Sequence, residues 1–212
     1  MDSGSTISKD EEEYFDYIFP NIYYNGLVNE AYGLLEEHHS HLFLITSDVS
    51  IEEPQSLYKR IQIAINDPEI GSYAPSARDT THAHMNNLKS SRMRKVLFTD
   101  GFCVVMPKDL LEMVCPIDLS VNKIGHGTDL YLGYLAMING RSAVVDDMVV
   151  VDHPRGSGYS IKEARIQRDR WFLTKSKKAQ LFHRLASNPL FKNSFGYHAM
   201  RLIFCLWSRL KN

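Results

Sequence analysis

The chain has 212 residues, 44% of them hydrophobic and 23% charged, with a net charge of −1, which is ordinary for a globular protein with a sizeable core. Its three cysteines are too few for a disulfide framework and lack zinc-finger spacing, and no apolar run approaches the ~18 residues that a spanning helix needs. The polar, acidic start lacks the basic-then-apolar order of a signal peptide, so we expect a cytoplasmic protein with free thiols.

The charges are distributed unevenly along the chain. Residues 1–161 contain 12 Lys and Arg against 23 Asp and Glu, a net charge of −11, whereas residues 162–212 contain 12 against 2, a net charge of +10. The acidic body and the basic tail must therefore have different surroundings or face each other.

The apolar pattern predicts alternating helices and strands after an N-terminal segment, residues 1–13, that we expect to be disordered. Residues 80–91 are polar and are expected to be a loop. The alternation predicts an α/β domain over residues 14–159 with a mainly parallel sheet. Its helices are expected at 26–37, 54–65, 108–114 and 129–138, and its strands at 42–45, 70–74, 96–98, 102–106, 143–145 and 148–151.

Residues 160–212 are expected to form a helical extension in which apolar residues are interleaved with Lys and Arg. Two interpretations stay open. In the first, the helices pack on the sheet and show their charges to solvent. In the second, a helix lies on an anionic membrane surface, which would make the protein peripheral on the inner face of the membrane. Nucleic-acid binding is not expected, because the acidic body would repel phosphate.

The first candidate site residue is Asp48, which follows the apolar run 42–45. An apolar run bounded by polar residues predicts an interior strand of a parallel sheet, and the residues just past it lie at the carboxyl edge, where open α/β sheets bind ligands. A carboxylate there can hold a hard cation, which can in turn hold a phosphate. The alternative is that Asp48 caps the helix that follows.

Two glycine-bearing segments come next. Gly101, after Asp100, either lets the backbone approach a ligand closely or only serves a turn. In the segment 124–130, two glycines flank a histidine and lead to Asp129, which opens an apolar helix. Asp129 is either a general base on a rigid helix start or, with Thr128, part of an N-terminal cap.

The fourth segment, residues 143–154, is a Val-rich strand region closed by His153. A histidine at this place is either a hydrogen-bonded strand-end residue or a metal ligand. The pair Asp146-Asp147 interrupts the region and is expected to be an exposed turn.

Taken in order, these segments resemble the GT-A fold of nucleotide-sugar-dependent glycosyltransferases of the family 2 type, a three-layer sandwich with a mainly parallel sheet as in the spore-coat-polysaccharide-synthesis type. The resemblance covers about residues 20–155. It implies that Asp48 and His153 hold the metal and that Asp129 is the catalytic base. It also implies substrate-binding roles for Ser47, Asp100, Gly101, Gly127, Thr128, Asn25 and Asn29.

The implied activity is sugar transfer in polysaccharide biosynthesis. The sugar would pass from a nucleotide-sugar donor to a hydroxyl of a glycan, lipid or protein acceptor, with Mn²⁺ or Mg²⁺ as the divalent metal. Asp129 would accept the proton of that hydroxyl, and the metal would neutralise the leaving diphosphate. Lys123, His126 and Arg155 are the candidates for contacts to the diphosphate.

Three features depart from the family pattern. The metal motif offers one carboxylate, Asp48, where the family has two, and Thr128 stands where the family usually has Glu. About 20 residues precede the Asn-bearing helix, where the family has a nucleotide-binding βαβ segment of about 30. The alternative function is therefore a truncated or inactive glycosyltransferase-like protein that acts as a binding module or membrane-associated partner. A third hypothesis is a metal-dependent hydrolase built on His82, His84, Asp48 and His153.

Overall fold

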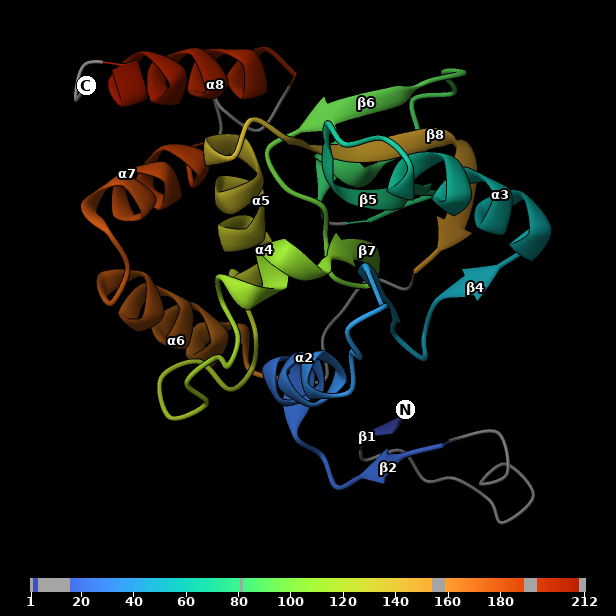
Figure 1. Ribbon diagram of the computed structural model, residues 1–212, viewed down its shortest axis with the longest axis horizontal. Helices are drawn as coiled ribbons and strands as arrows, with labels where there is room; N and C mark the ends of the chain where they lie inside the picture. The colour runs from blue at the N-terminus through green and yellow to red at the C-terminus, as the bar shows by residue number, and fades with distance from the viewer. Residues whose placement is uncertain (1, 4–15, 81, 154–158, 189–193, 210–212) are drawn as a thin grey trace.

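The computed structural model describes residues 2–3, 16–80, 82–153, 159–188 and 194–209 (Figure 1). The expected disordered segment 1–13 lies outside them except for Asp2–Ser3, which pairs with a second short strand. The strands are β1 (Asp2–Ser3), β2 (Ile18–Phe19), β3 (His41–Ile45), β4 (Ser50–Ile51), β5 (Ile70–Ala77), β6 (Met93–Val96), β7 (Cys103–Pro107) and β8 (Ser142–Asp152). The helices are α2 (Tyr23–Gly33), α3 (Pro54–Ile65), α4 (Lys108–Glu112), α5 (Thr128–Ile138), α6 (Ile161–Leu173), α7 (Lys177–Ala186) and α8 (Ser194–Arg209), with a 3₁₀ turn over Ala83–Met85.

The main sheet is mixed and has six strands (Figure 1). Its order is β3-β7-β5-β8-β4, and β6 also pairs with β8. Within the described part of this sheet only β5 and β8 pair in parallel, so the expectation of a mainly parallel sheet is wrong. The apolar pattern indicates that both faces of the strands are buried, but it does not indicate the direction of each strand. It therefore did not predict that β7 lies between β3 and β5 and runs antiparallel to both.

The strand before Asp48 is an edge strand and not an interior one. In the described sheet β3 pairs with β7 alone, and Phe43 and Ile45 are 41% and 42% exposed. The carboxyl end of β3 nevertheless lies where the sequence placed it. Because β7 is antiparallel to β3, the start of β7 lies at the same end of the sheet as Asp48.

The expected exposed turn at Asp146-Asp147 is also wrong. Both residues lie inside the single strand β8 and are 0% and 5% exposed, next to a bulge in its pairing with β5. Arg60 Nε donates to Asp146 Oδ2 at 2.6 Å, and Arg94 donates to both carboxylate oxygens of Asp147 at 2.8 and 3.0 Å. A buried carboxylate is tolerated only when it is paired in this way.

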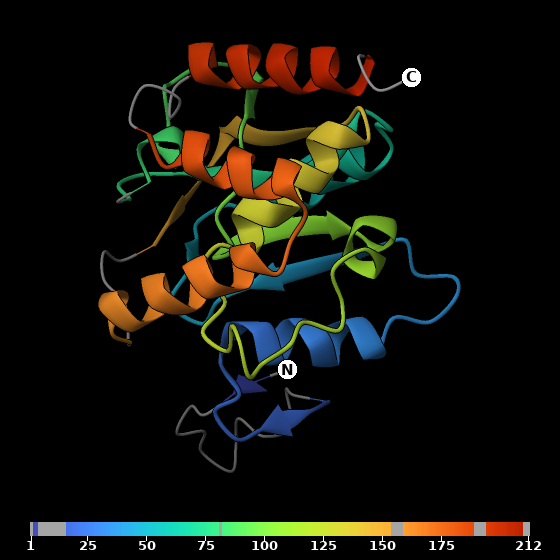
Figure 2. The same ribbon diagram turned by 90° about the vertical axis from the view of Figure 1, so that its left-hand side faces the viewer.

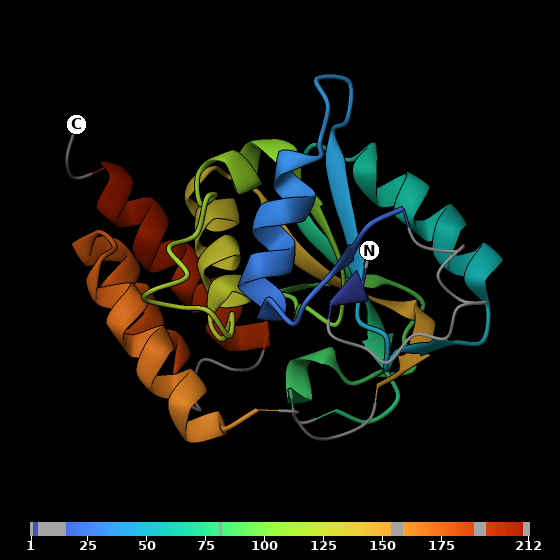
Figure 3. The ribbon, with the colours of Figure 1, turned by 90° about the horizontal axis from the view of Figure 1, so that it is seen from below.

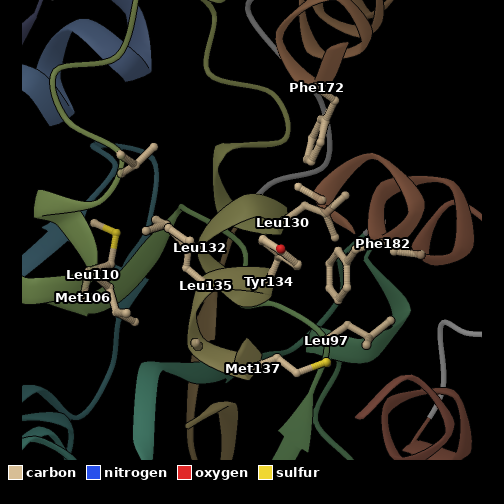
Figure 4. Close-up of a cluster of buried hydrophobic side chains, with 14 of the residues drawn as sticks. Leu97, Met106, Leu110, Leu130, Leu132, Tyr134, Leu135, Met137, Phe172 and Phe182 are labelled. Atoms are coloured by element: carbon tan, nitrogen blue, oxygen red, sulfur yellow. The ribbon is translucent and has the colours of Figure 1, made fainter. Parts of the chain in front are cut away.

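Two hydrophobic cores lie on the two faces of the sheet. Successive residues of β7 point to opposite faces, as the pleat requires: Cys103 and Val105 face the core under α3, and Val104 and Met106 face the core around α5. Figure 4 shows side chains of the second core around Tyr134, and Figure 3 shows α3 on the opposite side of the sheet from α6, α7 and α8.

The basic C-terminal helices share the core of the main domain. α7 and α8 contact α5, and α6 contacts α7 (Figure 2). Tyr134 of α5 has its ring centroid 5.4 Å from Phe182 of α7 and 6.0 Å from Phe204 of α8. The helices therefore pack through their aromatic residues on α5, beside the sheet. Within the described chain, no helix has the length and apolar character needed to cross a membrane.

Candidate active site

The residues singled out from the sequence gather at one end of the sheet. Asp48 follows β3, His153 follows β8, and Asp100 precedes β7, whose start lies at this end because it runs against its neighbours. Asp129 opens α5, close enough to Asp100 for the negative charge of that residue to act on its carboxyl group. Four separate segments thus bring two pairs to this end of the sheet, Asp48 with His153 and Asp100 with Asp129.

Asp48 and His153, which the family resemblance implies as metal ligands, lie side by side. The Nε2 atom of His153 lies 3.4 Å from Oδ2 of Asp48, with side chains 19% and 50% exposed. The imidazole stacks on the ring of Phe102, with centroids 4.5 Å apart and planes 13° apart. Thr46 donates from its N–H and its hydroxyl to the Phe102 carbonyl, at 2.8 and 3.2 Å, which ties the turn after β3 to the start of β7. Ser47, beside Asp48, is exposed.

This pair fits a divalent metal as two of its ligands. A carboxylate oxygen and a neutral imidazole nitrogen suit Mn²⁺, and two donors about 3 Å apart can bind one ion at adjacent positions. Across the residues that the structure describes, no three His, Cys, Asp or Glu side chains are grouped to hold a metal. The remaining positions around a bound ion would be taken by water and substrate oxygens.

Asp100 has a partner that the sequence analysis assigned to a different hypothesis. Nε2 of His82 lies 3.4 Å from Oδ2 of Asp100, and both side chains are partly buried. The neighbouring His84 packs its ring on Phe98, with centroids 4.5 Å apart. His82 therefore faces Asp100, and the ring contact of His84 is made with an aromatic side chain.

The segment that carries His82 is an ordered loop with a 3₁₀ turn. Arg94 Nη1 donates to the carbonyl of His84 at 3.1 Å and its Nη2 to that of Asn86 at 2.9 Å, while the same guanidinium pairs with buried Asp147. Hydrogen bonds from Arg94 and Ser90 hold the pKa of Asp147 below its ordinary value, although burial acts in the opposite direction. A buried ion pair thus fixes the loop beside the site.

Asp129 lies at the start of α5, where Gly127, with φ at 91°, occupies the N-cap position. The positive φ explains why glycine stands there. The Thr128 hydroxyl donates to Asn25 Oδ1 at 2.8 Å. It therefore links α5 to α2 and does not cap α5. Asp129 accepts a hydrogen bond from the N–H of Leu130 at 2.7 Å.

The surroundings of Asp129 favour its protonated form. Burial, and then the negative charge of Asp100, raise the pKa of Asp129 to about 7, and the nearby His82 and the Leu130 N–H only partly offset this. A carboxylate with a pKa near the working pH can accept a proton and release it again, which is the property of a general base.

The candidates for diphosphate contacts are placed differently from one another. Burial, and then the cation of Arg168, lower the pKa of His126 to about 4, so this imidazole is neutral at pH 7. The ammonium of Lys123 lies 4.7 Å from the centre of the Tyr23 ring. Arg155 lies outside the described residues.

Asn25 and Asn29 bind the loop that leads to Asp129. Asn25 Nδ2 donates to the Asn122 carbonyl at 2.7 Å. The amide of Asn29 donates to the Ile117 carbonyl at 2.9 Å and accepts from the Ile117 N–H at 2.7 Å. The two side chains hold α2 against residues 117–128, and a contact of either with substrate stays a prediction.

Tyr24 is a site residue that sequence reasoning missed. Its ring lies against Gly101 and Gly125, and a Cβ on Gly125 would lie 2.6 Å from Tyr24 Cδ1. Gly101 thus allows a tyrosine to approach the backbone. The glycine pattern was the only signal for this contact, and it did not identify what would approach.

The sequence matches no known family model and no curated protein. The resemblance to GT-A glycosyltransferases therefore depends on the four sequence segments alone.

Proposed function

We propose that this chain is a glycosyltransferase that moves a sugar from a nucleotide-sugar donor to an acceptor hydroxyl with the aid of a divalent metal. The observation that carries the proposal is the position of Asp129, a carboxylate with a pKa near 7 beside Asp100. The same end of the sheet carries the Asp48–His153 pair. The finer expectation of a GT-A-type sandwich belongs to this proposal as well.

The reaction would proceed by direct displacement at the anomeric carbon. The acceptor oxygen forms the new bond to that carbon, the bond from the carbon to the diphosphate oxygen breaks, and the nucleoside diphosphate leaves. Asp129 accepts the proton of the acceptor hydroxyl. Mg²⁺ or Mn²⁺, held by Asp48 and His153, would neutralise charge on the leaving diphosphate.

Asp100 and His82 support the base in this scheme. The negative charge of Asp100 raises the pKa of Asp129, and the imidazole of His82 opposes that effect. Together with Gly101, Asp100 would line the donor sugar. Asp100 and His82 would thus set the pKa of Asp129, and Asp100 would also contact the substrate.

The membrane-surface expectation also stays a proposal. Helix α6 exposes Ile161 and Leu173, which are 43% and 69% exposed, among exposed Lys162, Arg165 and Arg170. This mixture would suit a lipid-linked acceptor at an anionic bilayer. Cosedimentation with phosphatidylserine vesicles, compared with neutral vesicles, would test it.

The deciding experiment is a thermal-shift screen of UDP-, GDP-, CMP- and dTDP-sugars with and without Mn²⁺, followed by a transfer assay of Asp129→Asn. A ligand at 100 times its dissociation constant stabilises by about 2.7 kcal/mol, which is readily detected. We expect a metal-dependent shift with one nucleotide, and a variant that binds this donor but transfers no sugar. Full activity of the variant would remove Asp129 from the role. No shift with any donor would favour the non-catalytic binding module instead.

A further inference from the structure

The phenol of Tyr24 reaches into the wall of the candidate site. A Cβ on Gly101 would collide with Tyr24 Oη, and a Cβ on Gly125 would collide with its ring. Both positions must therefore be glycine for the tyrosine to fit. The hydroxyl lies against the turn that presents Asp100, and the ring lies against the loop that leads to Asp129.

The hydroxyl of Tyr24 is buried and has no hydrogen-bond partner among the described residues. Burying an unpaired hydroxyl costs about 1–3 kcal/mol, so such a group needs an explanation. Burial, and then the charges of Asp129 and Asp100, raise the pKa of Tyr24, so the phenol keeps its proton. The charged groups that act on it are both carboxylates, which are hydrogen-bond acceptors.

We propose that Tyr24 is a positioning residue whose hydroxyl donates a hydrogen bond to the Asp129–Asp100 carboxylate pair when the pair is ionised. Catalytic hydrogen bonds are often long in ligand-free enzymes and shorten in the working complex. Such a bond would favour the ionised form of Asp129 and hold its carboxylate in one orientation. The catalytic meaning of the bond rests on the proposed function, whereas the bond itself does not.

Other titratable groups face the same carboxylates from neighbouring elements. His82, before the 3₁₀ turn, lies beside Asp100. The pKa of Tyr159, before α6, is raised by burial and by both carboxylates. His126 lies on the loop before α5 and is neutral at pH 7. A change confined to the Tyr24 hydroxyl leaves all of these in place.

The test that needs no substrate is an NMR titration of the Asp129 carboxyl carbon in the full chain, with Asp129→Asn to assign the signal. In Tyr24→Phe we expect the Asp129 pKa to rise by roughly one unit, because a hydrogen bond to a charged group is lost. The melting temperature at pH 5, where Asp129 is protonated, should not fall. Tyr32→Phe, which removes a phenol from the same helix α2, should change neither quantity. An unchanged Asp129 pKa in Tyr24→Phe would overturn the proposal. A lowered melting temperature at pH 5 would also overturn it, because the hydroxyl would then have a structural partner that does not depend on the ionised carboxylate.

The kinetic test measures the pH profile of kcat/KM for sugar transfer. The acid limb should move to higher pH by the same unit, so that kcat/KM at pH 6 falls roughly tenfold in Tyr24→Phe and stays unchanged in Tyr32→Phe. If the Asp129 pKa measured by NMR shifts in Tyr24→Phe but the acid limb of the kinetic profile does not, Asp129 is not the catalytic base. The proposed function then loses its main residue, whereas the hydrogen bond assigned to Tyr24 is retained. A wild type without transfer activity would have the same consequence.

Discussion

Asp129→Asn is predicted to stabilise the folded protein at high pH while it abolishes sugar transfer. The pKa of Asp129 rises from its ordinary value of 3.8 to about 7 because burial, and then the charge of Asp100, disfavour ionisation. Between about pH 4 and 7 the folded protein therefore binds more protons than the unfolded chain, and its stability falls as the pH rises through that window.

The size of the effect follows from the pKa values. At about 1.36 kcal/mol per pKa unit, ionised Asp129 costs the folded state up to about 4 kcal/mol. Between pH 5 and 8 the free energy of unfolding of the wild type falls by about two pKa units of this effect, which is roughly 2.7 kcal/mol. The variant shows no such fall, because asparagine has no proton to lose. The free energy of unfolding of Asp129→Asn minus that of wild type should increase by this amount. His126 titrates with the opposite sign, but it is common to both proteins and cancels in the difference.

Urea unfolding at several values between pH 5 and 8, followed by circular dichroism, measures this difference. Asp16→Asn is the matched control, because Asp16 is exposed and its substitution should give a flat difference. A difference for Asp129→Asn that stays constant to within about 0.5 kcal/mol would contradict a partly buried Asp129 that is protonated below pH 7. A rise in stability with loss of transfer would show that the fold retains a destabilising group for its chemistry.

Three further predictions concern the metal pair, His126 and the buried ion pair. Asp48→Ala and His153→Ala should each weaken Mn²⁺ binding at least about tenfold by calorimetry, and unchanged binding in both would exclude the pair as ligands. Because the pKa of His126 is about 4, the wild-type protein loses stability as the pH falls from about 6.5 toward 4. The free energy of unfolding of His126→Gln should therefore rise by roughly 2 kcal/mol relative to wild type between pH 8 and pH 5. Parallel curves of stability against pH for the two proteins would rule this out. Arg94→Met leaves Asp147 buried without its cation, so it should lower the free energy of unfolding in urea by about 3–5 kcal/mol. The double variant Arg94→Met/Asp147→Leu should restore most of this loss. A loss below about 1 kcal/mol in Arg94→Met would argue against a buried ion pair.

The sequence located the elements better than it oriented them. The predicted helix at 54–65 has the bounds of α3, and the helix predicted at 129–138 begins one residue late. Apolar periodicity reports which side of an element is buried, and that information is local. Strand direction depends on which strands become neighbours, so the reversed β7 could not be read from it.

Asp146 and Asp147 show the same limit for charges. Two adjacent aspartates in a valine-rich stretch read as an exposed turn because burying them unpaired would cost several kcal/mol. Their partners, Arg60 and Arg94, stand far away in the sequence on α3 and β6. The pairing that makes burial tolerable exists only in three dimensions. Asp48 and His153 were associated through the family resemblance, and the structure places their side chains 3.4 Å apart.

Helix α6, the first helix of the basic tail, lies against the loop that leads to Asp129. Gln167 of α6 accepts hydrogen bonds from the N–H groups of Lys123 and Ile124, at 3.0 and 3.1 Å. The stem of Arg168 lies so close to Gly127 that a Cβ there would come within 2.6 Å of Arg168 Cγ. Helix α6 therefore covers the loop that presents the candidate base.

This arrangement matters for the proposed reaction. Asp48, Asp100 and Asp129 would together repel a diphosphate donor, and the repulsion is strongest where water is excluded. The positive charge of Arg168 contributes to lowering the pKa of His126, so its electrostatic effect reaches the loop before α5. A basic helix at this place would offset the repulsion between the carboxylates and the donor. Donor affinity should then fall in Arg168→Gln with no loss of the Asp129 pKa shift, which separates attraction of the diphosphate from tuning of the base.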